Sequence, residues 1–118
     1  MTEVNKQKVY VVVRTDQEKS NDTEVIGIYS TRKKAERKIL GILKQQYDDA
    51  MKCRNGKHNM ICGFEECGDD EERFADIDFE NGFTWENLLR VIKKELASGE
   101  VDDLEYCERY FIESSYVD

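Results

Sequence analysis

The stretch Lys8–Tyr47 constrains the fold most, because it holds the densest apolar residues of the chain between clear turn and capping signals. Lys8–Thr15 predicts a strand with three valines on one face and Tyr10 and Val12 on the other. Apolar residues on both faces indicate an interior strand that is covered at least in part on both sides. The polar run Asp16–Asp22 is too long for a two-residue hairpin loop. Thr23–Tyr29 predicts the second strand, in which Gly27 marks a bulge or a close backbone approach.

A helix is expected directly after the second strand, whose Ile26 and Ile28 are predicted to share one face. Ser30, or alternatively Thr31, carries the hydroxyl that caps a helix N-terminus. The apolar residues that then recur at helical spacing are Ala35, Ile39, Ile42, Leu43 and Tyr47. Gly41 costs up to about 1 kcal/mol relative to alanine inside a helix, which predicts close packing against the sheet there.

The middle of the chain is a Cys-containing insertion at about residues 52–73, followed by an alternating segment. Asn55-Gly56 is a hairpin-turn signal and predicts a short strand at Asn59–Phe64. Arg73–Glu80 alternates in polarity and predicts a further strand. The buried face expected for that strand consists of Arg73, Ala75, Ile77 and Phe79.

The last third predicts a second helix and a closing strand. Thr84 supplies an N-cap hydroxyl and Gly99 a C-terminal stop. The apolar stripe of this helix is Trp85, Leu88, Leu89, Ile92 and Leu96. Glu100–Glu105 is expected to be exposed, and Tyr106–Val117 predicts the closing strand. Its expected core-facing residues are Tyr110, Ile112 and Tyr116.

These elements predict a single α+β domain over residues 1–118. We expect a small two-layer sandwich in which two helices pack on an antiparallel or mixed sheet of about three to five strands. The expected order is strand, strand, helix, a further strand in the insertion, helix and strand.

Four segments together carry a resemblance to a set of small uncharacterised proteins of phages, large DNA viruses and some bacteria. The segments are Lys8–Val13 (KVYVVV), Val25–Ser30 (VIGIYS), Thr31–Arg37 (TRKKAER) and Tyr110–Asp118 (YFIESSYVD). The resemblance implies an α+β fold and a viral or mobile-element setting. It transfers no catalytic residue, because the group has no known activity.

Composition and the lack of long apolar runs indicate the cellular location. No apolar run of about 7–15 residues follows a basic start, and no run approaches the ~18 apolar residues of a membrane span. We therefore expect an intracellular, cytoplasmic protein, located in the host-cell cytoplasm or the virion if it is viral. The four cysteines, Cys53, Cys62, Cys67 and Cys107, are expected to be reduced thiols.

Charge is divided unevenly along the chain. Residues 1–64 carry 13 Lys and Arg against 8 Asp and Glu, whereas residues 65–118 carry 5 against 18, so a net +5 faces a net −13. The two halves either neutralise each other in the fold or serve a partner of defined charge. The overall net charge of −8 disfavours tight nucleic-acid binding, which requires a basic surface.

Two charged clusters are candidate partner sites. The acidic candidates are Glu65, Glu66, Asp69, Asp70, Glu71 and Glu72. They would attract a basic protein groove, or they provide solubility alone. The basic candidates are Arg32, Lys33, Lys34, Arg37 and Lys38 at the start of the first helix. They would bind an anion or a protein partner, or they are solvated or paired internally.

A metal site is the third candidate. Cys53, His58, Cys62 and Cys67 have the ligand types of a structural zinc ion within fifteen residues. Strong zinc motifs open with a C-x2-C pair, which this spacing lacks. The alternative is three reduced cysteines and a surface histidine, with no cofactor.

The sequence therefore predicts a non-enzymatic protein, because it has no G-x-S-x-G, P-loop or Rossmann motif. We expect it to bind a protein partner through its acidic surface, as a viral or phage host-factor antagonist or minor assembly component. The alternative is a zinc-stabilised binding module that uses Cys53–Cys67. We expect no contact with a membrane, and a monomer or a homodimer that forms by strand pairing at an exposed edge beside Tyr110–Val117.

Overall fold

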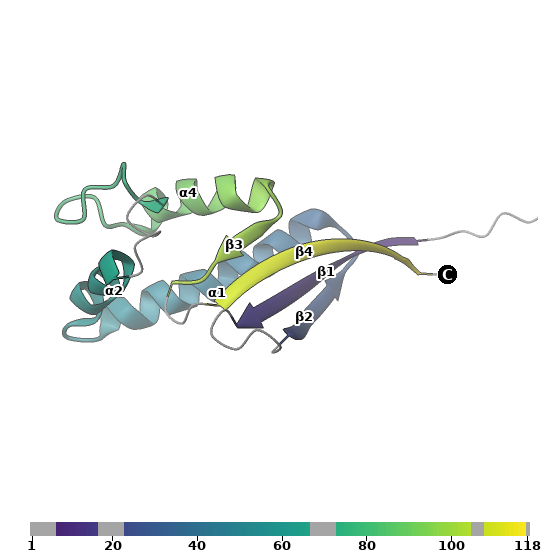
Figure 1. Cartoon of the computed structure of the whole chain (residues 1–118), viewed down its shortest axis with the longest axis horizontal. Helices are drawn as coiled ribbons and strands as arrows, with labels where there is room; N and C mark the ends of the chain where they lie inside the picture. The colour runs from purple at the N-terminus through teal and green to yellow at the C-terminus, as the bar shows by residue number, and fades with distance from the viewer. Residues whose placement is uncertain (1–6, 17–22, 67–72, 105–107, 118) are drawn as a thin grey trace, which may run out of the picture.

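The computed structural model describes residues 7–16, 23–66, 73–104 and 108–117. It is an α+β fold with one four-stranded antiparallel sheet in the order β2-β1-β4-β3 (Figure 1). The strands are β1 (Gln7–Asp16), β2 (Thr23–Tyr29), β3 (Glu100–Asp102) and β4 (Glu108–Val117). The helices are α1 (Arg32–Lys52), α2 (Gly56–Glu66) and α4 (Trp85–Ala97). The predicted fold class is confirmed.

The predicted first strand is confirmed as an interior strand. β1 lies between β2 and β4 and pairs with β4 over its whole length, from Gln7↔Val117 to Asp16↔Glu108. The side of β1 that carries Val12 faces α1 and belongs to the hydrophobic core. Figure 1 shows α1 behind the sheet, and no described helix covers the near face of β1, β2 and β4. The expected cover on both sides of β1 is present at Val9 and Val13, which are buried on this face, although no described helix packs there.

A β-bulge in β2 places Ile26 and Ile28 on opposite faces, so the prediction that they share one face is wrong. Val12 pairs with Gly27, whereas the next residue, Val13, pairs with Val25, so Ile26 is the additional residue. An extra residue in one strand reverses the alternation on either side of it. Ile26 consequently packs against the core, whereas Ile28 is 63% exposed on the opposite face. The bulge that Gly27 indicated is present.

Both long helices begin where their caps predict. Thr31, the alternative to Ser30, accepts a hydrogen bond from the Lys34 N–H at 3.2 Å and caps α1. Thr84 accepts from the Asn87 N–H at 3.3 Å and caps α4, and Gly99 follows that helix with φ of 101°. The fully buried residues of the two helices are Ala35, Ile39, Leu43, Leu88 and Ile92.

The middle of the chain differs most from prediction. Residues 56–66, in which a hairpin and a short strand were expected, form helix α2 instead. Gly56 is buried at its start, and a Cβ there would overlap the carbonyl oxygen of Ala50. The glycine thus permits a close helix–helix approach at the end of α1. Residues 73–80 form turns and no strand.

Arg73 explains why the alternation in residues 73–80 was misleading. Its guanidinium donates to both carboxylate oxygens of Glu95 on α4 at 2.9 Å. It also donates to the carbonyls of Asp102 at 2.7 Å and Asp103 at 3.2 Å. Phe74, which was placed on the exposed side, is buried beneath this guanidinium with its ring 4.7 Å away.

Three smaller expectations are also wrong. The segment Glu100–Glu105 is not exposed as a whole, because Val101 of β3 and the two residues after this strand, Asp103 and Leu104, are buried; Glu105 lies outside the described residues. Gly41 does not pack closely, since nothing lies within 4 Å of a Cβ built there. Tyr116 is 61% exposed, because β4 extends beyond the helical layer at its end. Among the described residues, no helix has the length and hydropathy to span a membrane.

Candidate functional site

The face of the sheet opposite α1 is apolar. Directly paired residues of antiparallel strands share a face, so the pairings Val11↔Ile28, Val13↔Val25 and Val13↔Phe111 place these side chains together. We call this surface the open face. Its apolar residues are Val9, Val11, Val13, Val25, Ile28, Phe111 and Val117.

The open face is not part of the protein's hydrophobic core. Val25 is 59% exposed and Ile28 is 63% exposed, and Val9 and Val13 lie outside the core cluster although they are buried. An antiparallel sheet with one solvated face ordinarily carries polar residues there. Apolar side chains gathered on a surface instead mark an interaction site.

Acidic groups border the open face along β4 and β3. Arg109 donates to Asp102 at 2.8 Å and lies 3.9 Å from Glu100, so one cation is shared by two carboxylates. Glu113 is directly opposite Val11 and is exposed, and it makes no ion pair with any residue that the structure describes. The border is therefore net negative beside an apolar centre.

The basic cluster at the start of α1 is divided by the fold. Arg32 donates to the Leu96 carbonyl at the end of α4 at 2.8 Å and lies 3.7 Å from Glu36, so it has a structural role. The Lys34 ammonium contacts the Ser30 hydroxyl at 3.2 Å. Lys33, Arg37 and Lys38 of this cluster are exposed and make neither an ion pair nor a side-chain hydrogen bond with the residues that the structure describes.

The metal candidates are brought together only in part. His58 and Cys62 lie one helical turn apart on α2, with Nε2 and Sγ 3.5 Å apart. Cys53 is exposed beyond the end of α1, and Cys67 lies outside the described residues. Within the ranges described, no group of three or more potential ligands forms. The arrangement supplies two of the four ligands that a tetrahedral zinc site requires.

The acidic candidates lie mostly beyond the described structure. The backbone of Glu65 and Glu66 forms the last turn of α2. Asp69, Asp70, Glu71 and Glu72 lie outside the described residues. Neutralisation between the two halves of the chain is seen at Arg14, which contacts Glu108 at 3.8 Å, whereas Arg73 and Glu95 pair within the second half.

Apart from Arg14 and Arg109, whose pKa values are raised further, two described titratable groups have shifted pKa values. Hydrogen bonds from the Glu80 N–H at 3.0 Å and the Asn81 amide at 3.2 Å hold the pKa of the exposed Asp78 carboxyl below its usual 3.8. Burial raises the pKa of the Tyr110 phenol above 10.0. Neither shift moves a group toward neutrality, where a general acid or base works best.

Sequence reasoning missed the open face and Lys93. Val25 and Phe111 lie beside the valines of β1 on the open face only because of the strand pairing, which the sequence alone does not reveal. The run of valines in β1 is the available signal, and it predicts cover on both sides of the strand and not an exposed apolar face. Lys93 lies on α4, but it lines the same hollow as Lys33 and Arg37 of α1.

Comparison with known proteins gives one match. A family model described as a domain of unknown function, DUF7336, matches residues 7–67. Searches of curated proteins and of solved structures found no match. The matched segment contains β1, β2, α1 and α2, and it spans just over half of the 118 residues. The chain therefore belongs to the DUF7336 family.

Proposed function

We propose that this chain is a non-enzymatic binding protein whose open face contacts a protein partner. The supporting observation is the cluster of apolar side chains on the helix-free side of the sheet, where Val25 and Ile28 remain mostly exposed. Burying a side chain such as isoleucine contributes about 1.5–3 kcal/mol. A partner that covered this face would gain that free energy at several positions.

The border charges define the chemistry of the partner. Two carboxylates share Arg109, and Glu113 has no cation among the described residues. A partner with an apolar centre and a rim of Lys or Arg is complementary to this arrangement. Such pairing raises the association rate and makes it sensitive to salt. The net charge of −8 acts in the same direction at longer range.

The face of the sheet is a better contact surface than its β2 edge. The bulge at Ile26 interrupts the regular hydrogen-bonding ladder of β2. Bulges on outer strands hinder the addition of another strand. The same bulge turns both Val25 and Ile28 toward the open face, so it increases the apolar area there.

The sequence resemblance adds a viral or phage origin to this proposal. If the chain is viral or comes from a phage, its partner is a host protein that it antagonises or a component of the particle in which it assembles. A basic partner is compatible with either role.

Affinity capture with paired variants tests the proposal. We expect a discrete basic protein to bind the wild type from lysate of the source cells at low salt and to dissociate at high salt. Val25→Thr combined with Ile28→Thr should abolish this capture. Tyr116→Thr is the matched control, because Tyr116 is equally exposed but pairs with Lys8 on the other side of the sheet.

The purified partner then allows the affinity to be measured. Loss of about 1.4 kcal/mol corresponds to a tenfold weaker Kd, so the double variant should bind at least about tenfold more weakly. Circular dichroism should show an unchanged fold, because both side chains are on the surface. Equal binding by the double variant and the wild type would refute the proposal.

A further inference from the structure

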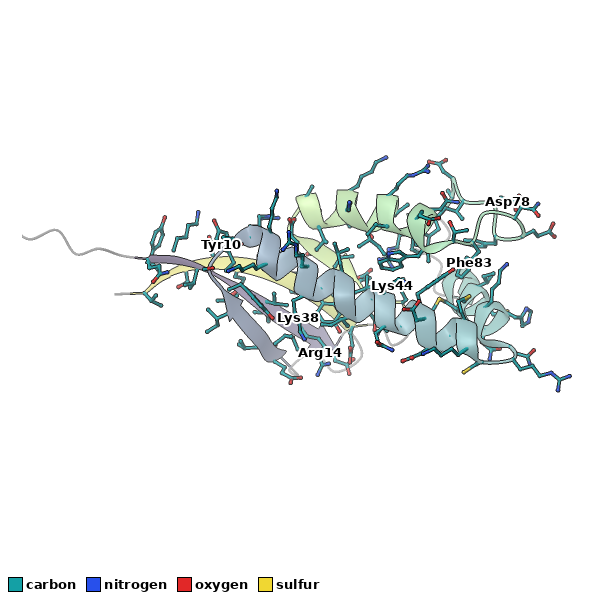
Figure 2. The ribbon with its side chains drawn as sticks, turned by 180° about the vertical axis from the view of Figure 1, so that it is seen from behind. Tyr10, Arg14, Lys38, Lys44, Asp78 and Phe83 are labelled. Atoms are coloured by element: carbon teal, nitrogen blue, oxygen red, sulfur yellow. The ribbon has the colours of Figure 1, made fainter. Side chains whose placement is uncertain are left out.

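The outward side of α1 carries a notch between two hollows. Lys33, Arg37, Gly41 and Gln45 are exposed and follow one another at intervals of four residues, so they share one side of the helix. Gly41 interrupts this row, since it has no side chain and nothing lies within 4 Å of a Cβ built there. Figure 2 looks at the molecule from the side of α1.

Two hollows lie on either side of this row and share Arg37. One, of about 390 Å³, lies between α1 and α4 and is lined by Lys33, Glu36, Arg37, Leu40, Lys93 and Leu96. The other, of about 430 Å³, is lined by Arg37, Lys38, Gly41, Ile42, Gln45, Gln46 and Asp49. A chain that crosses α1 at Gly41 would reach both hollows.

The hollows have an excess of positive charge. Lys33, Arg37, Lys38 and Lys93 make no ion pair with the residues that the structure describes. Each hollow has one lining carboxylate against two or three cations: Glu36 lies 3.7 Å from Arg32, and Asp49 accepts from the Gln45 amide at 2.8 Å. The positive end of the α1 dipole increases the potential near Lys33.

Gly41 lowers the stability of α1, and no packing contact explains why a glycine occupies this position. Glycine disfavours a helix interior more than any residue except proline. In the described structure no neighbouring group requires its small size. A close backbone approach by a bound chain is a use for glycine that fits both the exposure and the adjacent hollows.

We infer that this surface, which we call the α1 notch, binds an extended acidic peptide segment of a protein partner. Its carboxylates would pair with Lys33, Arg37, Lys38 and Lys93, its backbone would cross at Gly41, and an apolar side chain would contact Leu40 or Ile42. The site is separate from the open face and does not depend on it. A nucleic acid fits less well, because the whole chain is acidic and the walls include leucine and isoleucine.

Fluorescence anisotropy with defined probes tests the inference. The probe is a fluorescein-labelled twelve-residue peptide of alternating Glu and Leu, whose extended length of about 40 Å exceeds the ~32 Å length of α1 and so reaches both hollows. The comparison probes are the same peptide with Gln in place of Glu and a single-stranded oligonucleotide of similar charge. We expect saturable, salt-sensitive binding of the Glu peptide and at least about tenfold weaker binding of both others.

Three variants locate the binding. Arg37→Gln should weaken the Glu peptide at least about tenfold. Lys94→Gln changes net charge equally on an exposed residue that lines neither hollow, and should change binding less than about twofold. Gly41→Gln should fill the notch and weaken binding about tenfold without lowering the melting temperature, since the space around Gly41 is open.

Four results would overturn the inference. They are absence of peptide binding, tighter binding of the oligonucleotide, an equal loss in Lys94→Gln and Arg37→Gln, and full binding by a folded Gly41→Gln variant. An equal loss in the two charge variants would mean that only general attraction operates. The open-face capture experiment uses other residues, so either proposal can fail without the other.

Discussion

Replacing Arg73 with methionine should destabilise the fold strongly. The Arg73 side chain is 5% exposed, and it joins Glu95 of α4 to the backbone carbonyls of Asp102, the last residue of β3, and of Asp103. Methionine retains much of the aliphatic volume but none of the donors. The Glu95 carboxylate and two carbonyls would lose hydrogen bonds from a charged group at once.

The size of the effect follows from this geometry. Removing one partner of a buried ion pair costs ~3–5 kcal/mol. The Glu95 side chain is 27% exposed and can be rehydrated in part, so the lower end of that range applies, about 3 kcal/mol. With a urea m-value of about 2 kcal/mol/M, the unfolding midpoint should fall by about 1.5 M.

Urea unfolding followed by the fluorescence of Trp85, the single tryptophan, measures this change. Arg90→Met is the matched control, because Arg90 is an exposed arginine on α4, the helix that carries Glu95. Its midpoint should shift by less than about 0.25 M, equivalent to ~0.5 kcal/mol for a surface substitution. Glu95→Gln combined with Arg73→Met should cost clearly less than the sum of the single changes. Equal midpoints for Arg73→Met and Arg90→Met would refute the structural role assigned to Arg73.

Two further predictions concern Gly56 and Tyr110. Gly56→Ala should lower the free energy of unfolding by about 1–3 kcal/mol through overlap with the Ala50 carbonyl, whereas Gly41→Ala should raise it by up to about 1 kcal/mol in the same urea assay; a gain at both positions would contradict the helix contact. Because burial raises the folded-state pKa of Tyr110 above 10.0, the folded state retains the phenol proton to higher pH than the unfolded chain. The resulting stability is present below about pH 10 and is lost as pH rises through the raised pKa. Unfolding midpoints between about pH 9 and 11 should decline less in Tyr110→Phe than in the wild type, and equal declines would contradict the burial effect.

The parts of the fold that were predictable carry local signals. Alternating valines fixed β1, and the hydroxyls of Thr31 and Thr84 with the apolar stripes behind them fixed α1 and α4. Each signal depends on neighbours within about one turn of helix or a few residues of strand. Elements of this kind can be recognised without knowledge of tertiary packing.

The parts that failed depend on contacts distant in sequence. Asn55-Gly56 has the residues of a hairpin turn, but the lack of a Cβ in Gly56 is used against Ala50. Phe74, expected on the exposed side, is buried beneath the Arg73 guanidinium, which α4 and β3 hold through acceptors 22 and 29 residues away. Ile28 lies on the face opposite the predicted one, because one bulge reversed the alternation after Ile26. No local pattern encodes these three outcomes.

The candidate sites divide in the same way. The basic residues of α1 were predicted from spacing alone. Their separation into a structural Arg32 and three residues without an ion pair in the described part of the chain, Lys33, Arg37 and Lys38, required the position of α4. The acidic partner site that was predicted at residues 65–72 remains a prediction. The carboxylates that border the open face come instead from β3 and β4.

Site-specific photo-crosslinking tests the open face most directly. A benzophenone-bearing residue is introduced at position 28 in one sample and at position 116 in another, because Ile28 and Tyr116 are similarly exposed on opposite sides of the sheet. Each is irradiated with the captured basic partner at low salt. We expect a covalent adduct from position 28 that is absent at high salt, and no adduct from position 116. An adduct from position 116 alone, or none from position 28 while the partner is bound, would contradict this expectation.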